Sequence, residues 1–389
     1  MKLNLVATCL FGLEHLLGEE IEALGYDRIE TIDGRVTFAG DEQAVALSNV
    51  FLRYAERVYI LLGSFPAPTF DALFEGTRAL PWEAFIGRDD AFPVKGHAIN
   101  SALHSVPDCQ KIIKKAIATR LTVSYGLLRF PETGVSYSVE FFLLRDRASL
   151  MIDTSGAPLH KRGWRTEAGV APIRETLAAA MAAISRPRED VLFADPFCGS
   201  GTIAIEAAML HNRIAPGRFR RFAAEAFPAI PASLFACARE EAADNERKDG
   251  FAVLASDIDP AMVELTLANA RRAHVDATVH ACVADARNFV PPAGRKGSIV
   301  TNPPYGERLM APGEAEQLYR DFGAVCRGLG SWHMYVITSH PDLPRLFGRR
   351  ADKIRKLYNG MIPCFLYQFF RTDAERRARE AYRKEVGKK

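Results

Sequence analysis

The chain has 389 residues, of which 48% are hydrophobic and 25% charged, a composition typical of a globular protein long enough for two or three domains. Its net charge of only +3 excludes nucleic-acid binding through a global field, so any such affinity must come from local patches. The seven cysteines form no Cys-x-x-Cys pair and no stretch approaches the ~20 apolar residues of a membrane span, which predicts a cytoplasmic protein without a disulfide framework, metal site or membrane anchor.

The first 64 residues have the pattern of a small α+β module. Alternating apolar residues indicate strands, apolar residues at helical spacing indicate helices, and Asp33-Gly34 is typical of a hairpin turn. The expected elements are a strand at 3–8, a helix at 12–24, paired strands within 28–39, a helix at 41–51 and a strand at 57–64.

Residues 65–155 form a second predicted unit, which contains a lysine cluster. Lys111, Lys114 and Lys115 share one face of a predicted helix, because side chains three and four positions apart are neighbours. Such a cluster suits phosphate groups, although a solvated face of an amphipathic helix is the simpler interpretation. The expected elements are helices at 70–80 and 108–125 and a hairpin formed by 135–144 and 148–154.

A linker is expected at 156–169, where basic residues lie beside an aromatic one. Stretches of this kind can combine phosphate contacts with base stacking. We therefore expect Lys161, Arg162 and Arg165 to contact the phosphates of a nucleic acid together with the lysine cluster. Two stretches of the chain interleave basic residues with aromatic ones. Their residues are Arg162, Trp164, Arg165, Arg213, Arg218, Phe219, Arg220, Arg221 and Phe222.

The remaining residues, 170–389, have the pattern of a Rossmann-like α/β domain. An apolar run leads into Asp195-Pro-Phe-Cys-Gly199-Ser-Gly201, and a helix pattern begins at Thr202. Strand, glycine loop and helix form the first unit of a doubly wound fold, in which ligands bind at the carboxyl ends of the strands. The loop lacks the ending of a phosphate-binding loop, and Asp195 suits an ammonium or a ribose better than a pyrophosphate. A tight turn without a ligand would also use two glycines.

Two more acidic segments follow strand-like runs. Asp257 is placed to accept from ribose hydroxyls, and Ile258 to pack on an adenine face. Asp259 is expected to cap the next helix, since a proline follows it. Asp285-Ala286 offers an acceptor to an adenine amino group. Each acid alone is more often a cap or a surface residue, but together they follow successive strands, as a nucleoside ligand requires.

A further apolar strand ends in Asn302-Pro303-Pro304-Tyr305. The prolines have no N–H and a fixed φ, so the turn is stiff and its carbonyl oxygens are expected to point outward as acceptors. The Asn302 side chain and the Pro303 carbonyl can accept both N–H groups of an exocyclic amine, while Tyr305 stacks on the ring that carries it. Asn-Pro is also a common strand-ending turn.

Three motifs resemble the signatures of class I S-adenosylmethionine-dependent RNA methyltransferases with a THUMP domain. The motifs are Asp195-Pro-Phe197-Cys-Gly199-Ser-Gly201-Thr202, Ser256-Asp-Ile-Asp259 and Asn302-Pro-Pro-Tyr-Gly-Glu-Arg-Leu309. The sequence is most similar to the N-terminal half of the bacterial bifunctional 23S rRNA guanine-N2 methyltransferase. Segments 159–165, 171–177 and 214–217 share this resemblance, which runs to about residue 370.

The resemblance implies a ferredoxin-like module at 1–64, a THUMP RNA-binding domain at 65–155 and a methyltransferase domain at 170–389 that methylates guanine N2 in 23S rRNA. It implies that the catalytic residues are Asn302, Pro303, Pro304 and Tyr305. The cofactor residues that it implies are Asp195, Phe197, Gly199, Gly201, Thr202, Asp257, Ile258, Asp285, Ala286 and Asn302.

Other functions fit part of the pattern. The Asn-Pro-Pro-Tyr tetrad also serves adenine-N6 and other amine methyltransferases, including DNA enzymes, and a tRNA guanine-N2 methyltransferase has a similar domain layout. A non-catalytic RNA-binding assembly factor that retains the cofactor fold is a fourth interpretation. The THUMP-like half favours RNA over DNA, and the retained tetrad and glycine loop favour an enzyme.

Overall fold

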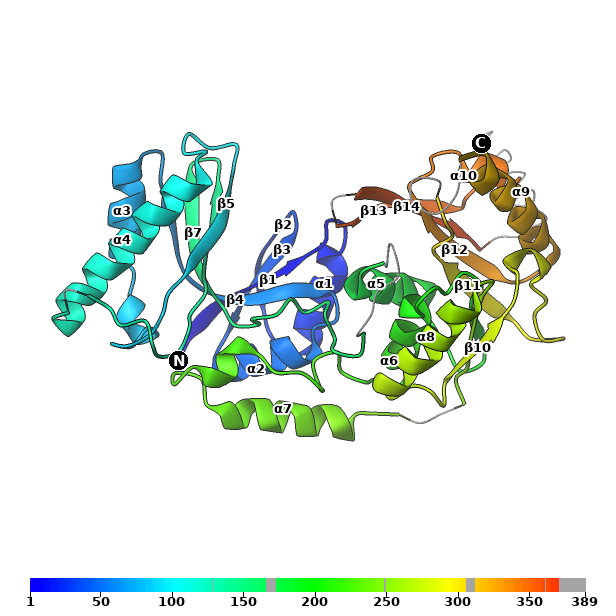
Figure 1. Ribbon diagram of the computed structural model, residues 1–389, viewed down its shortest axis with the longest axis horizontal. Coiled ribbons are helices and arrows are strands. Elements are labelled where there is room, and N and C mark those ends of the chain that lie inside the picture. Colours follow the sequence, from blue (N-terminus) through cyan, green and yellow to red (C-terminus); the bar gives the residue numbers. More distant parts are fainter. Residues whose placement is uncertain (128, 166–172, 248–249, 306–311, 361, 371–389) are drawn as a thin grey trace, which may run out of the picture. The chain divides into compact units, whose positions relative to one another are not determined.

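The computed structural model describes all residues except 128, 166–172, 248–249, 306–311, 361 and 371–389. The chain divides into two compact units (Figure 1). Unit 1 comprises Met1–Cys9, Glu14–Leu159 and Pro216–Asp244, and unit 2 comprises Leu10–Leu13, His160–Ala215 and Asn245–Lys389. Within the described part of the chain, no helix is both long and apolar enough to cross a membrane.

Unit 1 contains a seven-stranded sheet with the order β2-β3-β1-β4-β7-β6-β5. The long strand β4 (Ala55–Pro66) lies at its centre, because it pairs with β1 on one side and with β7 on the other. This strand spans residue 64, where the sequence placed a boundary between two modules. The other strands are β1 (Leu3–Cys9), β2 (Arg28–Ile32), β3 (Arg35–Gly40), β5 (Val94–Ile99), β6 (Val139–Leu144) and β7 (Arg147–Asp153).

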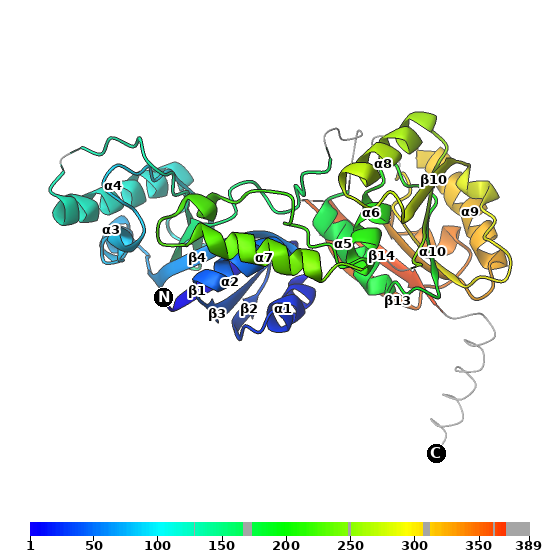
Figure 2. The same cartoon turned by 90° about the horizontal axis from the view of Figure 1, so that it is seen from below.

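Two helices of unit 1, Glu42–Phe51 and Phe70–Arg78, begin after polar residues that cap them. The Asp41 side chain accepts a hydrogen bond from the Ala44 N–H at 2.9 Å, and Thr69 accepts one from Ala72 at 3.2 Å. Helices α3 and α4 lie side by side (Figures 1 and 2). The helices are α1 (Glu14–Ala23), α2 (Glu42–Phe51), α3 (Phe70–Arg78), α4 (Val106–Tyr125) and the 3-10 turn η1 (Trp82–Ala84).

Unit 2 is the expected doubly wound α/β domain, with the strand order β10-β9-β8-β11-β12-β14-β13. Strands β8 to β12 are parallel to one another, and the antiparallel hairpin of β14 and β13 is added beside β12, to which β14 is antiparallel. The order reverses between β8 and β11, which is where ligands bind in such sheets. The strands are β8 (Leu192–Asp195), β9 (Val253–Asp257), β10 (Val279–Val283), β11 (Gly297–Thr301), β12 (His333–Thr338), β13 (Lys353–Asn359) and β14 (Ile362–Phe369).

Two groups of helices pack on this sheet. Helix α6 is rich in apolar residues and buried over most of its length, as a core helix should be. Aromatic side chains of α9 and α10, including Tyr319, Phe322 and Phe347, form a buried cluster with Met334 and Phe369 of the sheet. The helices are α5 (Glu175–Ser185), α6 (Thr202–His211), α8 (Pro260–Arg272), α9 (Pro312–Gly328), α10 (Leu343–Leu346) and the 3-10 turn η3 (Ala286–Asn288).

Residues 216–244 belong to unit 1, although the sequence placed all of 170–389 in the α/β domain. This segment carries the 3-10 turn η2 (Ala223–Ala226) and helix α7 (Ala232–Asp244). Helix α7 buries one face and lies along α2 (Figure 2). The segment therefore leaves the methyltransferase-like sheet after α6 and returns to it before β9.

Several expected features lie outside the described residues: the Gly306-to-Leu309 end of the tetrad motif, the end of the linker at 166–169, the start of 171–177 and the last part of the predicted methyltransferase domain, 371–389. Elsewhere, the predicted elements occur close to their expected bounds. One difference is that the strand expected at 135–144 begins only at Val139, because Ser136 forms an isolated bridge with Ala91 before it.

Candidate active site

Asp195 joins the two strands at which the sheet order reverses. It ends β8, is only 1% exposed, and its Oδ1 accepts a hydrogen bond from the hydroxyl of Thr301, the last residue of β11, at 2.6 Å. Oδ1 also accepts the Phe197 N–H at 3.3 Å. The buried Oδ2 has no hydrogen-bond partner within the described residues. Burial raises the pKa of Asp195 to about 7, because the carboxylate loses its hydration.

The glycine loop is held from one side by α8. Gly201 precedes α6 with φ +83°, and a Cβ there would lie 2.7 Å from Cγ2 of Thr266, so the close approach of α8 requires glycine. The Thr266 hydroxyl also donates to the Gly199 carbonyl at 2.8 Å. At Gly199 itself, a Cβ would meet nothing within 4 Å. The loop is therefore fixed in shape but leaves open space at Gly199, where a ligand can approach the backbone.

The end of β9 is hydrogen-bonded to the glycine loop. Asp257 Oδ2 accepts the Gly199 N–H at 2.9 Å and Oδ1 accepts the Asp259 N–H at 3.0 Å. Ile258, between them, is 65% exposed. Asp259 caps α8 by accepting the Ala261 N–H at 2.9 Å, as the sequence predicted. This arrangement presents a half-buried carboxylate and an exposed apolar side chain next to the loop.

Asp285 lies at the end of a third strand but is already engaged. It caps η3 and accepts hydrogen bonds from the backbone N–H of Arg287 at 2.9 Å and from its Nε at 3.0 Å. The Arg287 guanidinium holds the pKa of this carboxyl below its usual range. Ala286 is buried in the core of the domain. A ligand at this strand end would meet a charge pair rather than a lone carboxylate.

The Asn302-to-Tyr305 turn is anchored from α9. The buried hydroxyl of Tyr319 donates to the Pro304 carbonyl at 3.0 Å and hydrogen-bonds the Thr338 hydroxyl at 2.9 Å. The expectation of free carbonyl oxygens on both prolines is therefore wrong for Pro304. Asn302, Pro304 and Tyr305 are half-buried, while Pro303 is buried. Burial raises the pKa of the Cys364 thiol of β14, and the Tyr305 side chain opposes this shift.

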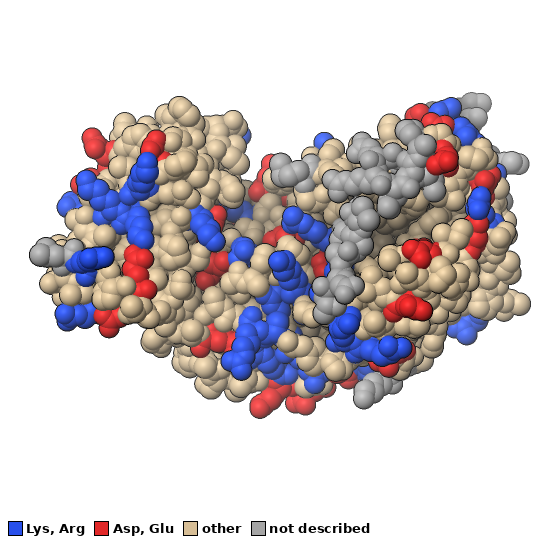
Figure 3. All heavy atoms as spheres, in the orientation of Figure 1, with Lys and Arg blue, Asp and Glu red and all other residues tan. Residues whose placement is uncertain are grey.

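The predicted lysine cluster lies on α4, with the exposed side chains on one face and Ile113 and Ile117 buried on the other. Figure 3 shows Lys and Arg side chains gathered over this part of the surface. Lys111 lies 3.5 Å from Asp108, and Lys114 lies 2.8 Å from Glu132. Lys115 lies over the Phe74 ring, with its Nζ 5.8 Å from the ring centroid. All three lysines are accessible to a phosphate. Lys111 and Lys114 would each contact that phosphate while a carboxylate lies beside them.

The three cations that were predicted to contact RNA from the linker do not all lie at the surface. Arg162 is buried, and its Nε lies 3.1 Å from Glu206 Oε1, with both side chains at most 1% exposed. Arg165 hydrogen-bonds the Thr202 hydroxyl and lies 3.4 Å from Glu175. The predicted RNA contact is therefore wrong for Arg162, because its guanidinium neutralises a buried glutamate, and Arg165 holds the start of α6. Only Lys161 of this set is exposed.

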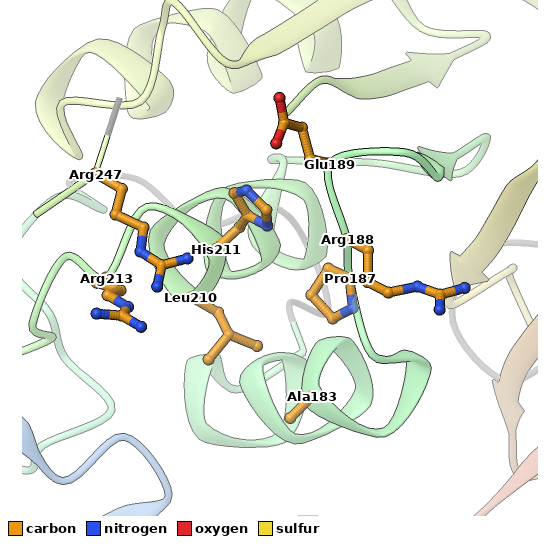
Figure 4. A pocket seen from close by; sticks show the side chains of 8 residues that line it. All are labelled: Ala183, Pro187, Arg188, Glu189, Leu210, His211, Arg213 and Arg247. Atoms are coloured by element: carbon orange, nitrogen blue, oxygen red, sulfur yellow. The ribbon is translucent and has the colours of Figure 1, made fainter. Parts of the chain in front are cut away.

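A separate pocket lies at the opposite edge of the same sheet, before β8 and after α6. None of the residues that line it belongs to the predicted site. Figure 4 shows Arg213 and Arg247 on one side of the pocket and Glu189 on another. Its lining residues are Ala183, Pro187, Arg188, Glu189, Leu210, His211, Arg213 and Arg247.

Family models match almost the whole chain. A model described as RMKL-like, methyltransferase domain, matches residues 162–368, an RlmL ferredoxin-like domain matches 4–59, and a THUMP domain matches 67–153. The chain belongs to the RMKL-like methyltransferase family. This result confirms the family predicted from the three motifs and the predicted fold class, an α/β methyltransferase domain after a ferredoxin-like and THUMP region.

Relatives of this RMKL-like methyltransferase include YpsC of Bacillus subtilis (strain 168), whose name assigns RNA methyltransferase activity provisionally. It is 42% identical over 95% of this chain and 96% of its own length. A Listeria monocytogenes structure described as a predicted N6-adenine-specific DNA methylase is 43% identical, with a TM-score of 0.89 over 95% of this chain and 96% of that one. SMU.472, described provisionally as a methyltransferase and solved with SAH, is 40% identical, with a TM-score of 0.89 over 95% and 98%.

The residues at the strand ends fit S-adenosylmethionine, the cofactor that these matches support. Asp195 Oδ2 is a buried acceptor without a hydrogen-bond partner within the described residues, which suits a ligand that carries an ammonium group. Open space at Gly199 and the exposed Ile258 suit a nucleoside that lies against backbone and apolar side chain. The predicted cofactor thus agrees with both the family and the local chemistry.

Three residues that support the site were missing from the predicted set: Thr301, Thr266 and Tyr319. Thr301 directly precedes the tetrad, so its place at the end of an otherwise apolar strand was a usable signal. Thr266 and Tyr319 lie on helices, and their contacts with the loop and the turn depend on how those helices pack. No local pattern marks such residues.

The raised pKa of Asp195 predicts how the free energy of unfolding depends on pH. The folded state keeps the Asp195 proton up to about pH 7, whereas the unfolded chain releases it near the ordinary value of 3.8. Between these values the folded state binds more protons, so the contribution of this group to stability falls as pH rises. Asp195→Asn removes the titration. The free energy of unfolding of the wild type minus that of the variant, measured with urea, should be larger at about pH 5 than at about pH 8. A difference in the free energy of unfolding between wild type and variant that stays constant with pH would contradict this prediction.

Proposed function

We propose that this chain transfers a methyl group from S-adenosylmethionine to the exocyclic N2 of a guanine in RNA, with 23S rRNA as the target. The observation that carries the proposal is the position of Asn302-Pro303-Pro304-Tyr305 directly after Thr301, whose hydroxyl is bound by Asp195 of the glycine loop. The amine-binding tetrad and the cofactor loop are therefore joined by one buried hydrogen bond. Methyl transfer needs these two elements next to each other.

The residues that would hold the cofactor follow the strand ends. Asp195, Phe197, Gly199, Gly201 and Thr202 would surround the methionine part. Asp257 would accept from the ribose hydroxyls, Ile258 would cover the adenine, and Asp285 with Ala286 would lie at its amino group. Bound S-adenosylmethionine supplies an electrophilic methyl group on a sulfonium.

The tetrad would hold the acceptor amine. Asn302 Oδ1 and the Pro303 carbonyl accept the two N–H groups of N2, which directs the nitrogen lone pair away from them. Tyr305 stacks on the guanine, which must be flipped out or single-stranded because a base inside a duplex cannot reach the site. The Tyr319 hydrogen bond keeps the Pro304 carbonyl out of this recognition and fixes the turn. Water can take the proton that the methylated amine releases.

RNA is supported as the substrate by the THUMP match at 67–153, by the exposed lysines of α4 and by the name of YpsC. The choice of guanine N2 in 23S rRNA is supported by the motif resemblance and by the RlmL ferredoxin-like match at 4–59. A second candidate is adenine N6, because the Listeria relative is described as an N6-adenine methylase and the same two acceptors fit that amine.

The first test concerns the amine acceptor. Asn302→Ala should lower methyl transfer to RNA by about 100-fold, because a misplaced amine loses its in-line geometry. Transfer of labelled methyl groups from S-adenosylmethionine to RNA measures this. The affinity for SAH, measured by calorimetry, should stay within about twofold. Asn4→Ala, which truncates an exposed asparagine of unit 1, is the matched control and should keep full activity. Unchanged turnover in the Asn302 variant would remove the tetrad from the mechanism.

The second test concerns the ribose acceptor. Asp257→Ala should weaken SAH binding by roughly tenfold or more, because it removes a carboxylate that accepts charged hydrogen bonds and that fixes the Gly199 N–H. Asp276→Ala, which removes an exposed acid near the end of α8, is the control and should bind SAH normally. Equal calorimetric affinities for the two variants would exclude Asp257 from the cofactor site.

The third test identifies the RNA and the base. Cells that lack the protein should lose one N2-methylguanosine from 23S rRNA, and the wild-type gene but not the Asn302→Ala form should restore it. Nucleoside mass spectrometry of separated rRNA and tRNA measures the loss. Loss of the same nucleoside from tRNA would correct the target, and loss of N6-methyladenosine would support the second candidate. RNA binding without any loss of methylation would favour an assembly factor.

A further inference from the structure

The loop at residues 218–221 lies in the segment 216–244. This segment belongs to unit 1, although it lies within the methyltransferase half of the sequence. It was one of two stretches in which arginines alternate with aromatic residues. The other stretch is largely internal, since Arg162 and Trp164 are buried. At 218–221, by contrast, Phe219 is 50% exposed and Arg221 is exposed. The two stretches therefore have different roles, and only this one presents an aromatic ring at the surface.

The 218–221 loop is fastened at its start to α2. The N–H of Gly217 donates to the Val50 carbonyl at 2.9 Å. A Cβ at Gly217 would lie 2.5 Å from the Asn49 carbonyl oxygen and 2.7 Å from the Val50 Cα. Both atoms belong to the backbone and cannot give way. The chain therefore enters the loop at a fixed point that only glycine allows.

The loop is fastened at its end to α7 and η2. Phe222 is buried and stacks on Phe235 with ring centroids 5.7 Å apart. The Arg239 guanidinium donates to the Arg220 carbonyl at 2.8 Å and to Glu225 at 2.6 Å. The Arg220 side chain itself donates to the Pro158 carbonyl at 2.8 Å. Arg220 and Phe222 thus point inward and hold the loop, which leaves Phe219 and Arg221 on the outside.

The exposed side of the loop carries an aromatic ring between two cations. The Arg218 guanidinium lies 4.9 Å from the centroid of the Phe219 ring, within cation–π distance. Arg221 follows Phe219 two residues later in the sequence. Figure 3 shows Lys and Arg side chains gathered above helix α7 on this face. A half-exposed phenyl ring in a rigid, basic surrounding has little to gain from an apolar protein partner, because the adjacent guanidinium groups would lose their hydration.

We propose that the 218–221 loop is a binding site for a single-stranded RNA nucleotide, in which Phe219 stacks on an unpaired base and Arg218 and Arg221 contact the flanking phosphates. The proposal rests on the proposed function, because it concerns how the substrate RNA is held. Stacking on an aromatic side chain next to arginine is the usual mode for unpaired bases and tolerates any base. Because the loop is already fixed, binding costs little conformational entropy there.

The test measures RNA binding by the full-length protein in the presence of SAH, without turnover. The probes are a fluorescein-labelled single-stranded adenosine oligonucleotide and an abasic strand of equal length. Phe219→Ala should weaken binding of the adenosine strand by about tenfold and leave binding of the abasic strand unchanged. Phe219→Trp should retain or strengthen binding. Arg221→Ala should lower the slope of log affinity against log salt by about 0.7, whereas Phe219→Ala should leave that slope as it is.

Phe11→Ala is the matched control, because Phe11 is 51% exposed, close to the value for Phe219. It should bind both strands as the wild type does. Equal losses for the adenosine and abasic strands, no loss with Phe219→Ala, or a weakened Phe219→Trp variant would each overturn the stacking site. Weaker SAH binding in the Phe219→Ala variant would also overturn it, since that result indicates a structural role. The outcome is independent of methyl transfer, so failure here leaves the assignment of Asn302 standing.

Discussion

The hydrogen bond between Thr301 and Asp195 is the interaction on which the site depends. It connects the ends of two parallel strands, β8 and β11, at the point where the sheet order reverses. Both residues are buried, and Oδ2 of the carboxylate has no hydrogen-bond partner within the described residues. A buried carboxylate oxygen without a hydrogen-bond partner typically costs about 1–3 kcal/mol or more. The cost is explained if this atom serves a ligand, and the bond then fixes the spacing between that ligand and the turn after Thr301.

Further contacts extend this constraint to both sides of the switch point. Asp257 holds the glycine loop through the Gly199 N–H, and Tyr319 holds the Asn302-to-Tyr305 turn through the Pro304 carbonyl. Each strand end is therefore tied to its neighbour or to a covering helix. Such ties hold the glycine loop and the turn in fixed positions before any ligand arrives, and fixed groups lower the entropic cost of reaching a reactive geometry.

The sequence predicted those parts of the fold and site that depend on short-range patterns. Spacing along one element was enough to predict the glycine loop, the strand-end acids, the Asp259 cap and the lysine face of α4. Arg162 could not be judged in this way, because its burial depends on Glu206 in a distant helix. The occupied carbonyl of Pro304 likewise depends on how α9 packs. Tertiary contacts decide whether a charged or polar group remains available, and a single sequence does not show them.

The segment 216–244 interleaves the two units along the sequence. It leaves unit 2 after α6, which begins at the glycine loop, and returns before β9, which ends at Asp257. Its helix α7 buries Phe235, Ala238 and Ala242 within unit 1. A fragment starting at residue 160 would therefore expose this apolar face in the middle of its cofactor-binding domain. The chain crosses between the units at 9–10, 13–14, 159–160, 215–216 and 244–245, so the units are joined by several covalent connections rather than by one linker. The segment thus brings an apolar face that is buried in unit 1 into the middle of the sequence of unit 2.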